Sequence, residues 1–269
     1  MANKRELVVN FSGGKDSTAM LHLMLEHGEK IDEVIYFDGG WEFPQMAEHV
    51  ELVEQKTGLK ITRLKPIDGD FDYWMLQREF TSRKKEAMRG KGIPNSKSRW
   101  CTFIKQQTIN KYLKGRDVIR CIGFAVGEER RLLRGWGKDR IFTIGDFRFP
   151  LVEDYNFDEV ECLQYCYKLG YTWGGLYDYI DRVSCYFCPL QNNAQSLMIK
   201  RHFPAVWEQI KNKCTDVTNT LTMARGGCAC NWKNGVEFDA TDRKLRGKDE
   251  GWDVNEWRAR LNMVDDSND

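Results

Sequence analysis

The sequence predicts an α/β protein built on a mostly parallel sheet. Over the first half of the chain, short apolar runs alternate with amphipathic segments, which is the order of a parallel sheet with crossover helices. In the stretch VVNFSGGKDST, residues 8–18, a glycine-rich turn joins an apolar run directly to a helical segment. The chain has 269 residues and 41% hydrophobic content, enough to bury the core of one large domain or of a domain with an appendage.

The first half divides into strands and helices in a regular order. Residues 6–11 predict the first strand, and the helical segment after it stops at Gly28. Pro44 and Gly58 are typical of the start and the end of a second helix. Further apolar runs predict three more strands, at residues 32–38, 60–65 and 117–124.

The remaining elements are less regular. Residues 69–98 predict a helix followed by an exposed, mobile loop, because a basic cluster and the stretch GKGIPNSKS follow Trp74. A helix resumes at the segment RWCTFIKQQTINKYL, and we expect Asn156 to cap another helix after residue 156. Strand patterns vanish beyond about residue 180, which predicts an α/β domain over 1–180 and a mainly helical, cysteine-containing region over 181–269.

Composition and charge limit the classes of protein. Forty-one basic and forty acidic residues give a net charge of +1, which neither demands nor forbids a nucleic-acid partner. We find no apolar run long enough to span a bilayer and no signal-peptide pattern, so we expect a cytoplasmic protein without a membrane partner. Nine cysteines in such a chain favour buried thiols, metal ligands or redox chemistry over a disulfide framework.

The glycine-rich turn predicts an anion site. Gly13 and Gly14 lie between a strand and a helix that begins near Asp16, so several unpaired backbone amides face one concavity at a helix N-terminus. Ser12, Ser17 and Lys15 add two hydroxyl donors and a positive charge suited to phosphate. The glycine spacing does not fit a Walker A loop. A plain turn between strand and helix is the alternative interpretation.

The six residues SGGKDS resemble the PP-loop of the N-type ATP pyrophosphatases, and four further segments resemble the phosphoadenosine phosphosulfate (PAPS) reductase family within that superfamily. These segments are FDGGWEFPQM, RWCTFIK, IGFAVGEERRLLR and FPLVEDYNFDEVECLQY. The resemblance runs over roughly residues 5–190. It implies a mostly parallel five-stranded sheet with helices on both faces, of the adenine nucleotide alpha-hydrolase type, followed by a C-terminal cysteine-bearing helical appendage.

The resemblance also implies roles for individual residues. Lys15 and Asp16 would serve catalysis with ATP and Mg²⁺, or with PAPS or adenosine phosphosulfate (APS) as the substrate. The implied nucleotide-binding residues are Ser12, Gly13, Gly14, Lys15, Asp16, Ser17, Asp38, Gly123 and Glu128, and the implied anion-binding residues are Lys105, Arg130 and Arg131. Sulfonucleotide reductases usually carry an arginine where this chain has Ala125, which weakens the reductase interpretation.

Three cysteines form a candidate metal centre. Cys185 and Cys188 make a CxxC turn, which can place two sulfurs on one metal. Together with Cys101 they resemble the three-cysteine clusters of PP-loop enzymes that insert sulfur into tRNA. We expect a 4Fe–4S cluster ahead of Zn²⁺, with Cys228 or Cys230 as a fourth ligand if there is one. The alternative is a reduced thiol pair or a thioredoxin-like redox couple.

Other features favour structural interpretations or leave two open. Cys121 lies in an apolar strand, and Cys162 and Cys166 share one helical face, so all three are expected in the core. Basic residues between 78 and 91 could guide a tRNA or DNA acceptor, and a solvated helix face explains them equally well.

Three functions remain open at this point. In the first, ATP adenylates an acceptor and a sulfur donor then thiolates it, with Lys15 stabilising the charge on the leaving pyrophosphate. In the second, the same loop binds PAPS or APS, and Cys228 or Cys230 attacks the sulfate sulfur before a thioredoxin-like reductant releases sulfite. The third is a nucleotide-binding module without turnover.

Overall fold

The structure, a computed structural model, describes residues 5–81, 87–94, 98–128, 146–183, 185–188, 191 and 193–220. The chain divides into two compact units that are each built from several segments. The first, here called the sheet unit, contains Met1–Asp38, Pro44–Lys65 and Lys105–Gly174. The second, the cysteine unit, contains Gly39–Phe43, Pro66–Ile104 and Gly175–Asp269. The two-domain boundary expected near residue 180 stays a prediction.

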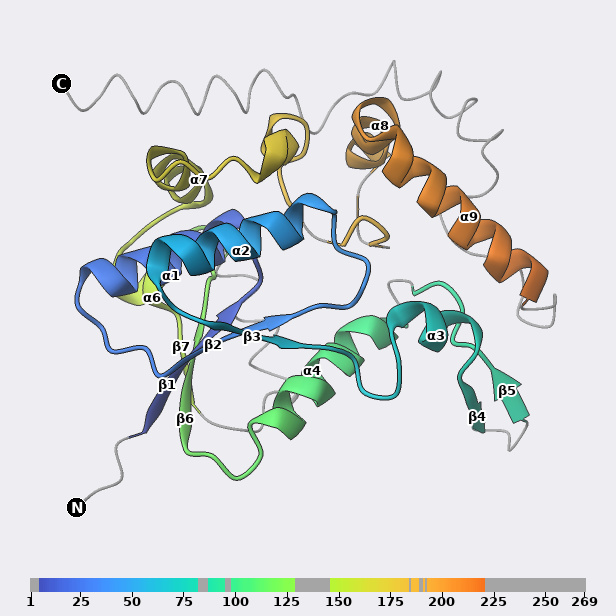
Figure 1. The fold of residues 1–269 in the computed structure, drawn as a ribbon, viewed down its shortest axis with the longest axis horizontal. Helices are drawn as coiled ribbons and strands as arrows, with labels where there is room; N and C mark the ends of the chain where they lie inside the picture. Colours follow the sequence, from blue (N-terminus) through green and yellow to red (C-terminus); the bar gives the residue numbers. More distant parts are fainter. Residues whose placement is uncertain are drawn as a thin grey trace. The chain divides into compact units, whose positions relative to one another are not determined.

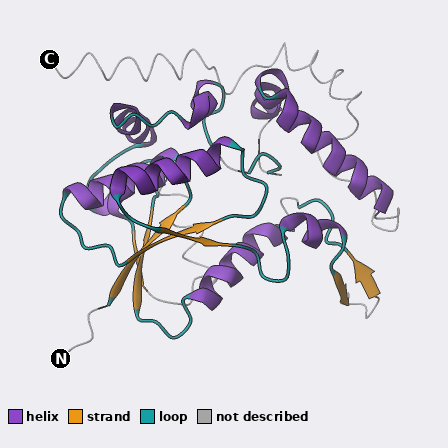
Figure 2. Cartoon of the chain, viewed as in Figure 1, coloured by secondary structure: helices purple, strands orange, loops and turns teal. Residues whose placement is uncertain are grey.

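The sheet unit is built on a five-stranded parallel sheet, as the sequence predicts (Figure 2). Its strands are β1 (Glu6–Phe11), β2 (Glu33–Phe37), β3 (Ile61–Leu64), β6 (Val118–Ile122) and β7 (Asp146–Arg148). They lie in the order β3-β2-β1-β6-β7, and each neighbouring pair is parallel. β7 has only three residues, two of them charged, so no apolar run indicates it in the sequence.

Helices cover both faces of this sheet. The helices that contribute to the sheet unit are α1 (Lys15–Glu26), α2 (Gln45–Thr57), α6 (Pro150–Glu153), α7 (Glu159–Lys168) and the part of α4 (Trp100–Tyr112) that follows residue 104. From β1 to β3 the strands are added in one direction, and β6 is added on the other side of β1. Right-handed crossovers therefore place α1 and α2 on one face and α4 on the other (Figure 1).

The reversal of strand order between β1 and β6 determines where this sheet can bind a ligand. In open α/β sheets, the crevice outside the carboxyl ends of the strands opens where the strand order reverses. The SGGKDS loop follows β1 at this edge, and Gly123 follows β6. A Cβ atom on Gly123 would lie 3.0 Å from both N and Cα of Ser17. Glycine at this position therefore lets the two loops pack directly against each other.

The amino ends of the strands, opposite the SGGKDS loop, are held together by ion pairs. Arg116 precedes β6, and its guanidinium pairs with Glu6 of β1 and with Glu33 of β2, the latter at 2.7 Å. Tyr112 donates a hydrogen bond of 2.6 Å to the same Glu33. The amino ends of three strands are thus tied to one another on the side away from the SGGKDS loop.

The described part of the cysteine unit contains helices of different lengths and one hairpin. Its elements are α3 (Phe71–Leu76), β4 (Glu79–Thr81), β5 (Ala87–Arg89), the first turn of α4, most of the 3₁₀ helix η1 (Trp173–Asp178), α8 (Asn193–His202) and α9 (Pro204–Thr220). β4 and β5 pair antiparallel, with Glu79 opposite Arg89. The prediction of an exposed loop after α3 is therefore wrong for the residues of β4 and β5. The sequence does not indicate these strands because strands of three residues are too short to show a period.

The observed caps confirm one helix prediction and correct another. α2 begins after Pro44 and ends at Gly58 in the left-handed conformation, as expected. α7 is capped by Asp158, whose carboxylate accepts from the amides of Val160 and Glu161, and not by Asn156. Asn156 has φ +53° and lies two residues too early in the chain to cap α7. Of the helices in the described ranges, none combines the length and the apolar character that a membrane span requires.

Asp158→Ala should lower the free energy of unfolding by about 1 kcal/mol, because two amides of the first turn of α7 lose their acceptor. Urea unfolding followed by circular dichroism measures this change. Asn156→Gly is the matched control and should change stability by less than about 0.5 kcal/mol, since glycine adopts a positive φ without strain. Equal losses in the two variants would contradict the assignment of the cap.

Candidate functional site

The SGGKDS loop is held in shape by hydroxyl groups. Ser17 Oγ accepts from the amide of Ser12 at 3.1 Å, lies 3.0 Å from Ser12 Oγ and donates to the carbonyl of Gly14 at 3.1 Å. Gly13 has φ +79°, and a Cβ there would lie 2.5 Å from Met46 Cε. The loop therefore requires glycine at position 13 for its backbone conformation, since the Met46 methyl is the end of a flexible side chain and can shift to make room.

The first turn of α1 is suited to an anion. Gly14 is the N-cap residue, with an extended backbone, and it supplies no capping side chain to the amides of the first turn. A helix N-terminus carries partial positive charge, and its leading N–H groups point outward along the axis. Because this N-terminus lies at the reversal of strand order, the geometry supports the predicted phosphate-binding role of the loop.

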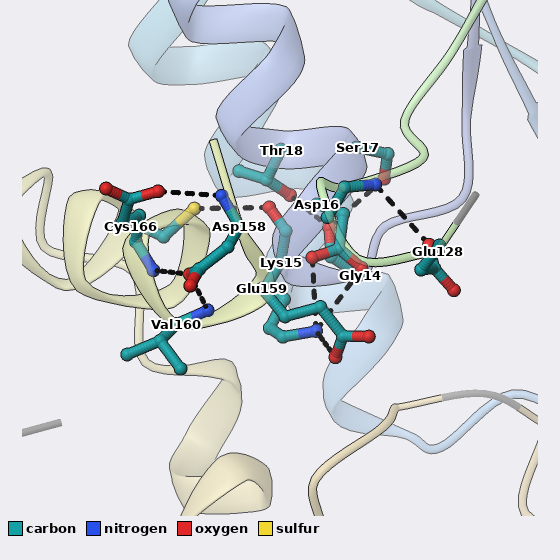
Figure 3. Close-up of polar contacts among 12 residues, drawn as sticks. Gly14, Lys15, Asp16, Ser17, Thr18, Glu128, Asp158, Glu159, Val160 and Cys166 are labelled. Carbon is teal, nitrogen blue, oxygen red and sulfur yellow. Dashed lines mark hydrogen bonds and ion pairs between the residues drawn. The ribbon is translucent and has the colours of Figure 1, made fainter. Parts of the chain in front are cut away.

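Lys15 is the most buried charged group of this loop. Only 2% of its surface is exposed, and its ammonium pairs with Glu159 at 2.8 Å and with Asp16 Oδ1 at 3.1 Å (Figure 3). Glu159 comes from the first turn of α7, and its side chain is 43% exposed. The thiol of Cys166, also on α7, donates to the carbonyl of Lys15 at 3.4 Å. α7 therefore fixes both the backbone and the charge of Lys15.

Asp16 experiences opposing electrostatic effects. Burial raises the pKa of its carboxyl, the nearby ammonium of Lys15 lowers it, and the charges of Glu159 and Glu128 raise it again, so that the net pKa lies above the usual value. Asp16 Oδ1 is buried and accepts no hydrogen bond with good geometry. A carboxylate oxygen of this kind fits a hard cation such as the Mg²⁺ that accompanies a nucleotide.

The remaining predicted nucleotide residues lie around the same edge of the sheet. Glu128 follows β6, and its carboxylate accepts from the amide of Ala125 at 3.4 Å, while Ala125 itself is fully buried. Asp38 follows β2 and donates its amide to the carbonyl of Leu64. Lys105 holds its ammonium 5.7 Å from the ring centroid of Phe37. Arg130 and Arg131 lie outside the described residues, as do Cys228 and Cys230.

The three cysteines of the proposed metal centre belong to the cysteine unit. Cys101 lies in the first turn of α4, and Cys185 and Cys188 lie in the turn before α8. Burial raises the pKa of Cys101, and the nearby charge of Cys188 raises it further. Trp41 contacts Trp100, the neighbour of Cys101, and Phe187, the neighbour of Cys188, with ring centroids 5.7 and 5.1 Å apart. This aromatic cluster joins the two cysteine-bearing segments.

Glu42 contacts one of these cysteines. The thiol of Cys185 donates to its carboxylate, with 3.9 Å between Sγ and Oε1, and an antiparallel backbone bridge pairs the two residues. The same carboxylate accepts from the amides of Gly39 and Trp41. These bonds hold the Glu42 carboxylate beside Cys185, where it could take the proton that the thiol would have to lose if its sulfur bound a metal.

The donor set fits a metal in its chemistry. Thiolates are the preferred ligands of zinc and of iron–sulfur clusters, and three of them leave one coordination position for another group. In the described parts of the chain, however, no three His, Cys, Asp or Glu side chains are grouped closely enough to hold a metal ion. The metal centre therefore stays a proposal that rests on the donors and on the segments that carry them.

The cysteines expected in the core are in the core. Cys121, Cys162 and Cys166 are fully buried. Burial raises the pKa of Cys121 to about 12, and it raises the pKa of Cys162 and of Cys166 still further. These thiols stay protonated at neutral pH and are poor nucleophiles.

Sequence reasoning missed three residues that contact the predicted ones. Glu159 follows the capping residue of α7, Glu42 lies inside the segment FDGGWEFPQM, and Trp173 donates from its indole to the carbonyl of Gly13. The tertiary contacts of Glu159 and Trp173 join positions more than 140 residues apart. Only for Glu42 did the sequence offer a signal, its place in a motif already singled out.

Comparison with known proteins supports the family resemblance. Residues 6–124 match the model of the phosphoadenosine phosphosulfate reductase domain. Two uncharacterized proteins of Methanocaldococcus jannaschii, MJ0066 and MJ0973, are 28% and 26% identical over 83% and 81% of this chain. The matches cover 44% and 49% of those proteins, so the chain spans less than half of their length.

A solved structure is also similar, but only weakly. It is the U34-tRNA thiolase NcsA from Methanococcus maripaludis with its [4Fe-4S] cluster, with 14% sequence identity and a TM-score of 0.35. The match covers 84% of this chain and 75% of that one. A similarity at this level supports no argument about the reaction.

The burial of the thiols predicts their order of reactivity. Iodoacetamide added to folded protein that a chelator has freed of metal should, at mildly alkaline pH, modify Cys121, Cys162 and Cys166 at least about a hundredfold more slowly than Cys185 and Cys188, because the buried sulfurs are protonated and shielded. Peptide mapping by mass spectrometry reads the rates, and protein unfolded in urea is the control in which the differences should vanish. Rapid labelling of Cys162 in the native protein would contradict the assignment.

Proposed function

We propose that the protein is an adenine-nucleotide enzyme of sulfur chemistry, because residues 6–124 match the model of the phosphoadenosine phosphosulfate reductase domain. We infer that it uses ATP to adenylate an acceptor and then transfers sulfur to that acceptor. The observation that carries the proposal is the buried ammonium of Lys15 at the uncapped N-terminus of α1. A positive charge in this position is suited to the phosphates of a nucleotide.

The proposed adenylation step uses this lysine and the amides beside it. An oxygen of the acceptor attacks the α-phosphorus of ATP, the bond from that phosphorus to the bridging oxygen breaks, and pyrophosphate leaves. Lys15 and the amides of the first turn of α1 would stabilise the negative charge that grows on the leaving group. Asp16, with its buried oxygen, is the best candidate to hold Mg²⁺, and Asp38 and Glu128 are candidates for the metal or the ribose.

The sulfur transfer step is assigned to the cysteine unit. A sulfur nucleophile attacks the activated carbon of the acceptor, and AMP leaves with the oxygen. Cys101, Cys185 and Cys188 would hold a 4Fe–4S cluster or alternatively Zn²⁺, which would supply a coordination position for the sulfur that is transferred. Glu42 would accept the proton of Cys185 as the metal site forms. A tRNA or DNA and a separate sulfur donor are the proposed partners.

The reductase alternative shares the same loop but needs different chemistry. PAPS or APS would bind, a cysteine thiolate would attack the sulfate sulfur, and a thiol reductant would release sulfite. Ala125 argues against it, since a methyl group buried in the turn after β6 supplies no cation to the sulfate. The match to the reductase domain model keeps this reaction as the second candidate.

Paired assays separate the candidates. We expect anaerobically purified protein to convert ATP to AMP and pyrophosphate when bulk tRNA is the acceptor, and to release no sulfite from PAPS or APS with a thiol reductant. Sulfite release would support the reductase instead. Binding of ATP without turnover in any reaction would support a module that only binds nucleotide.

Lys15→Met should weaken ATP binding at least about tenfold, because the phosphates lose a charge-assisted hydrogen bond. Calorimetric titration measures the change, and Lys56→Met, which removes a lysine that donates to the carbonyl of Leu169 in the same unit, is the control. Lys15→Met also leaves Asp16 and Glu159 without their shared cation, so the measurement is repeated with Glu159→Gln added to limit the loss of stability. Unchanged affinity in both backgrounds would refute the phosphate-binding role.

The metal centre has its own test. Wild-type protein purified without oxygen should contain stoichiometric iron, with the absorption of an iron–sulfur cluster, or stoichiometric zinc. Cys101→Ala, Cys185→Ala and Cys188→Ala should each lose most of this metal. Cys214→Ala, which changes a half-buried thiol of α9 in the same unit, should keep it. If wild-type protein purified without oxygen contains neither iron nor zinc, the metal proposal is refuted.

A further inference from the structure

The indole of Trp173 lies beneath the SGGKDS loop, in the sheet unit. Trp173 is 2% exposed, and its Nε1 donates a hydrogen bond of 2.7 Å to the carbonyl of Gly13. Its backbone has φ +48°, a left-handed conformation that is uncommon for a bulky residue. The chain therefore accepts local strain at the residue that contacts the first glycine of the loop.

The bond to Gly13 has a consequence for the next amide. In a trans peptide unit the C=O and the N–H point in opposite directions. Since the carbonyl of Gly13 points to Trp173, the N–H of Gly14 points in the opposite direction within the peptide plane, away from Trp173. An indole that holds this carbonyl thus sets the direction of the first amide that an incoming phosphate would meet.

The following peptide unit is held in the same way. The carbonyl of Gly14 accepts from Ser17 Oγ at 3.1 Å and from Thr18 Oγ1 at 3.0 Å (Figure 3). The N–H of Lys15 therefore also points away from these donors. The carbonyls of Gly13 and Gly14 both accept hydrogen bonds from side chains of the protein. The N–H groups of Gly14 and Lys15 therefore both point away from those side chains.

His49 completes the support below the loop. Its ring stacks on Trp173, with centroids 4.4 Å apart, and its Nε2 lies 3.0 Å from Thr18 Oγ1. Burial lowers the pKa of His49 to about 3, so the imidazole is neutral at physiological pH. The single hydroxyl proton of Thr18 goes to Gly14, so Nε2 of His49 is the donor to Thr18. Trp173 and Thr18 are thus connected through one ring.

We propose that Trp173 is a positioning residue for nucleotide phosphates, which acts by holding the carbonyl of Gly13 so that the N–H of Gly14 is aimed at the ligand before it binds. This inference rests on the proposed nucleotide function. Preorganised donors bind a developing or resident negative charge without the cost of reorienting on binding. Loss of the indole N–H of Trp173 should therefore lower the affinity for phosphate. Loss of a comparable indole N–H elsewhere in the chain should lower stability by a similar amount and leave that affinity unchanged.

The chain offers such a matched tryptophan. Trp74, in α3 of the cysteine unit, is 8% exposed, and its Nε1 donates to the carbonyl of Ile67 at 2.8 Å. Trp74→Phe and Trp173→Phe each delete one buried indole-to-carbonyl bond of nearly equal length. Their effects on the free energy of unfolding should be similar, and only Trp173→Phe should affect the loop.

The experiment is calorimetric titration of the full chain with ATP and with inorganic pyrophosphate. Trp173→Phe should weaken the binding of both ligands about tenfold, the loss expected for one misdirected hydrogen bond to a charged group, and Trp74→Phe should leave both affinities unchanged. In ligand-free protein, the amide resonance of Gly14 should shift in Trp173→Phe and stay in place in Trp74→Phe. Urea unfolding gives the accompanying change in stability.

Two outcomes of the titrations would contradict the proposed role of Trp173. Wild-type protein that binds neither ATP nor pyrophosphate would overturn the proposed function and this inference with it. If the wild-type protein binds these ligands and Trp173→Phe binds them with the same affinity, this inference alone is overturned and the proposed function stands. If Trp173→Phe does not fold, benzothienylalanine at position 173 keeps the shape of the indole and deletes only the N–H donor. Unchanged affinity in that protein would have the same meaning.

Discussion

The buried ammonium group of Lys15 is the constraint on which the candidate site depends. A lysine that is 2% exposed must be compensated, and in the ligand-free protein Asp16 and Glu159 supply the negative charge. This requirement fixes the position of α7, which provides Glu159 and also bonds the carbonyl of Lys15 through Cys166. Phosphates that enter the site would take over part of the compensation, so that ligand charge replaces protein charge around one fixed cation.

The cysteine unit is held together by aromatic packing and by an ion pair. Trp41 contacts the aromatic neighbours of Cys101 and of Cys188, and its indole N–H donates to Asp72 at 2.8 Å. Lys213 of α9 pairs with the same Asp72 at 2.5 Å. One tryptophan therefore connects the cysteine-bearing segments with the longest helix of the unit, and the chain places chemically soft side chains on a rigid aromatic frame.

The sequence indicates much of the fold and the loop of the candidate site, and there are physical reasons why it does not indicate the rest. β1, β2 and β6 are mostly apolar and largely buried, and β3 is a four-residue edge strand in which Arg63 is exposed. β7 and the β4–β5 hairpin have three residues per strand and no period to detect. Asn156 and Asp158 are both good capping residues, and only the backbone conformation selects Asp158. The loop residues form a contiguous motif. Glu159 and Trp173 reach that loop through tertiary contacts, which no local pattern encodes.

The two edges of the parallel sheet differ in what they contribute. The amino edge carries the ion pairs of Arg116 with Glu6 and Glu33, and the carboxyl edge carries the SGGKDS loop, Gly123 and Glu128. Substitutions at one edge need not disturb the other, because the full length of the strands separates them. A fold arranged in this way can change its chemistry over evolution while the ion pairs at the amino edge stay intact. An engineer could likewise strengthen the amino edge so that the protein tolerates destabilising changes at the carboxyl edge.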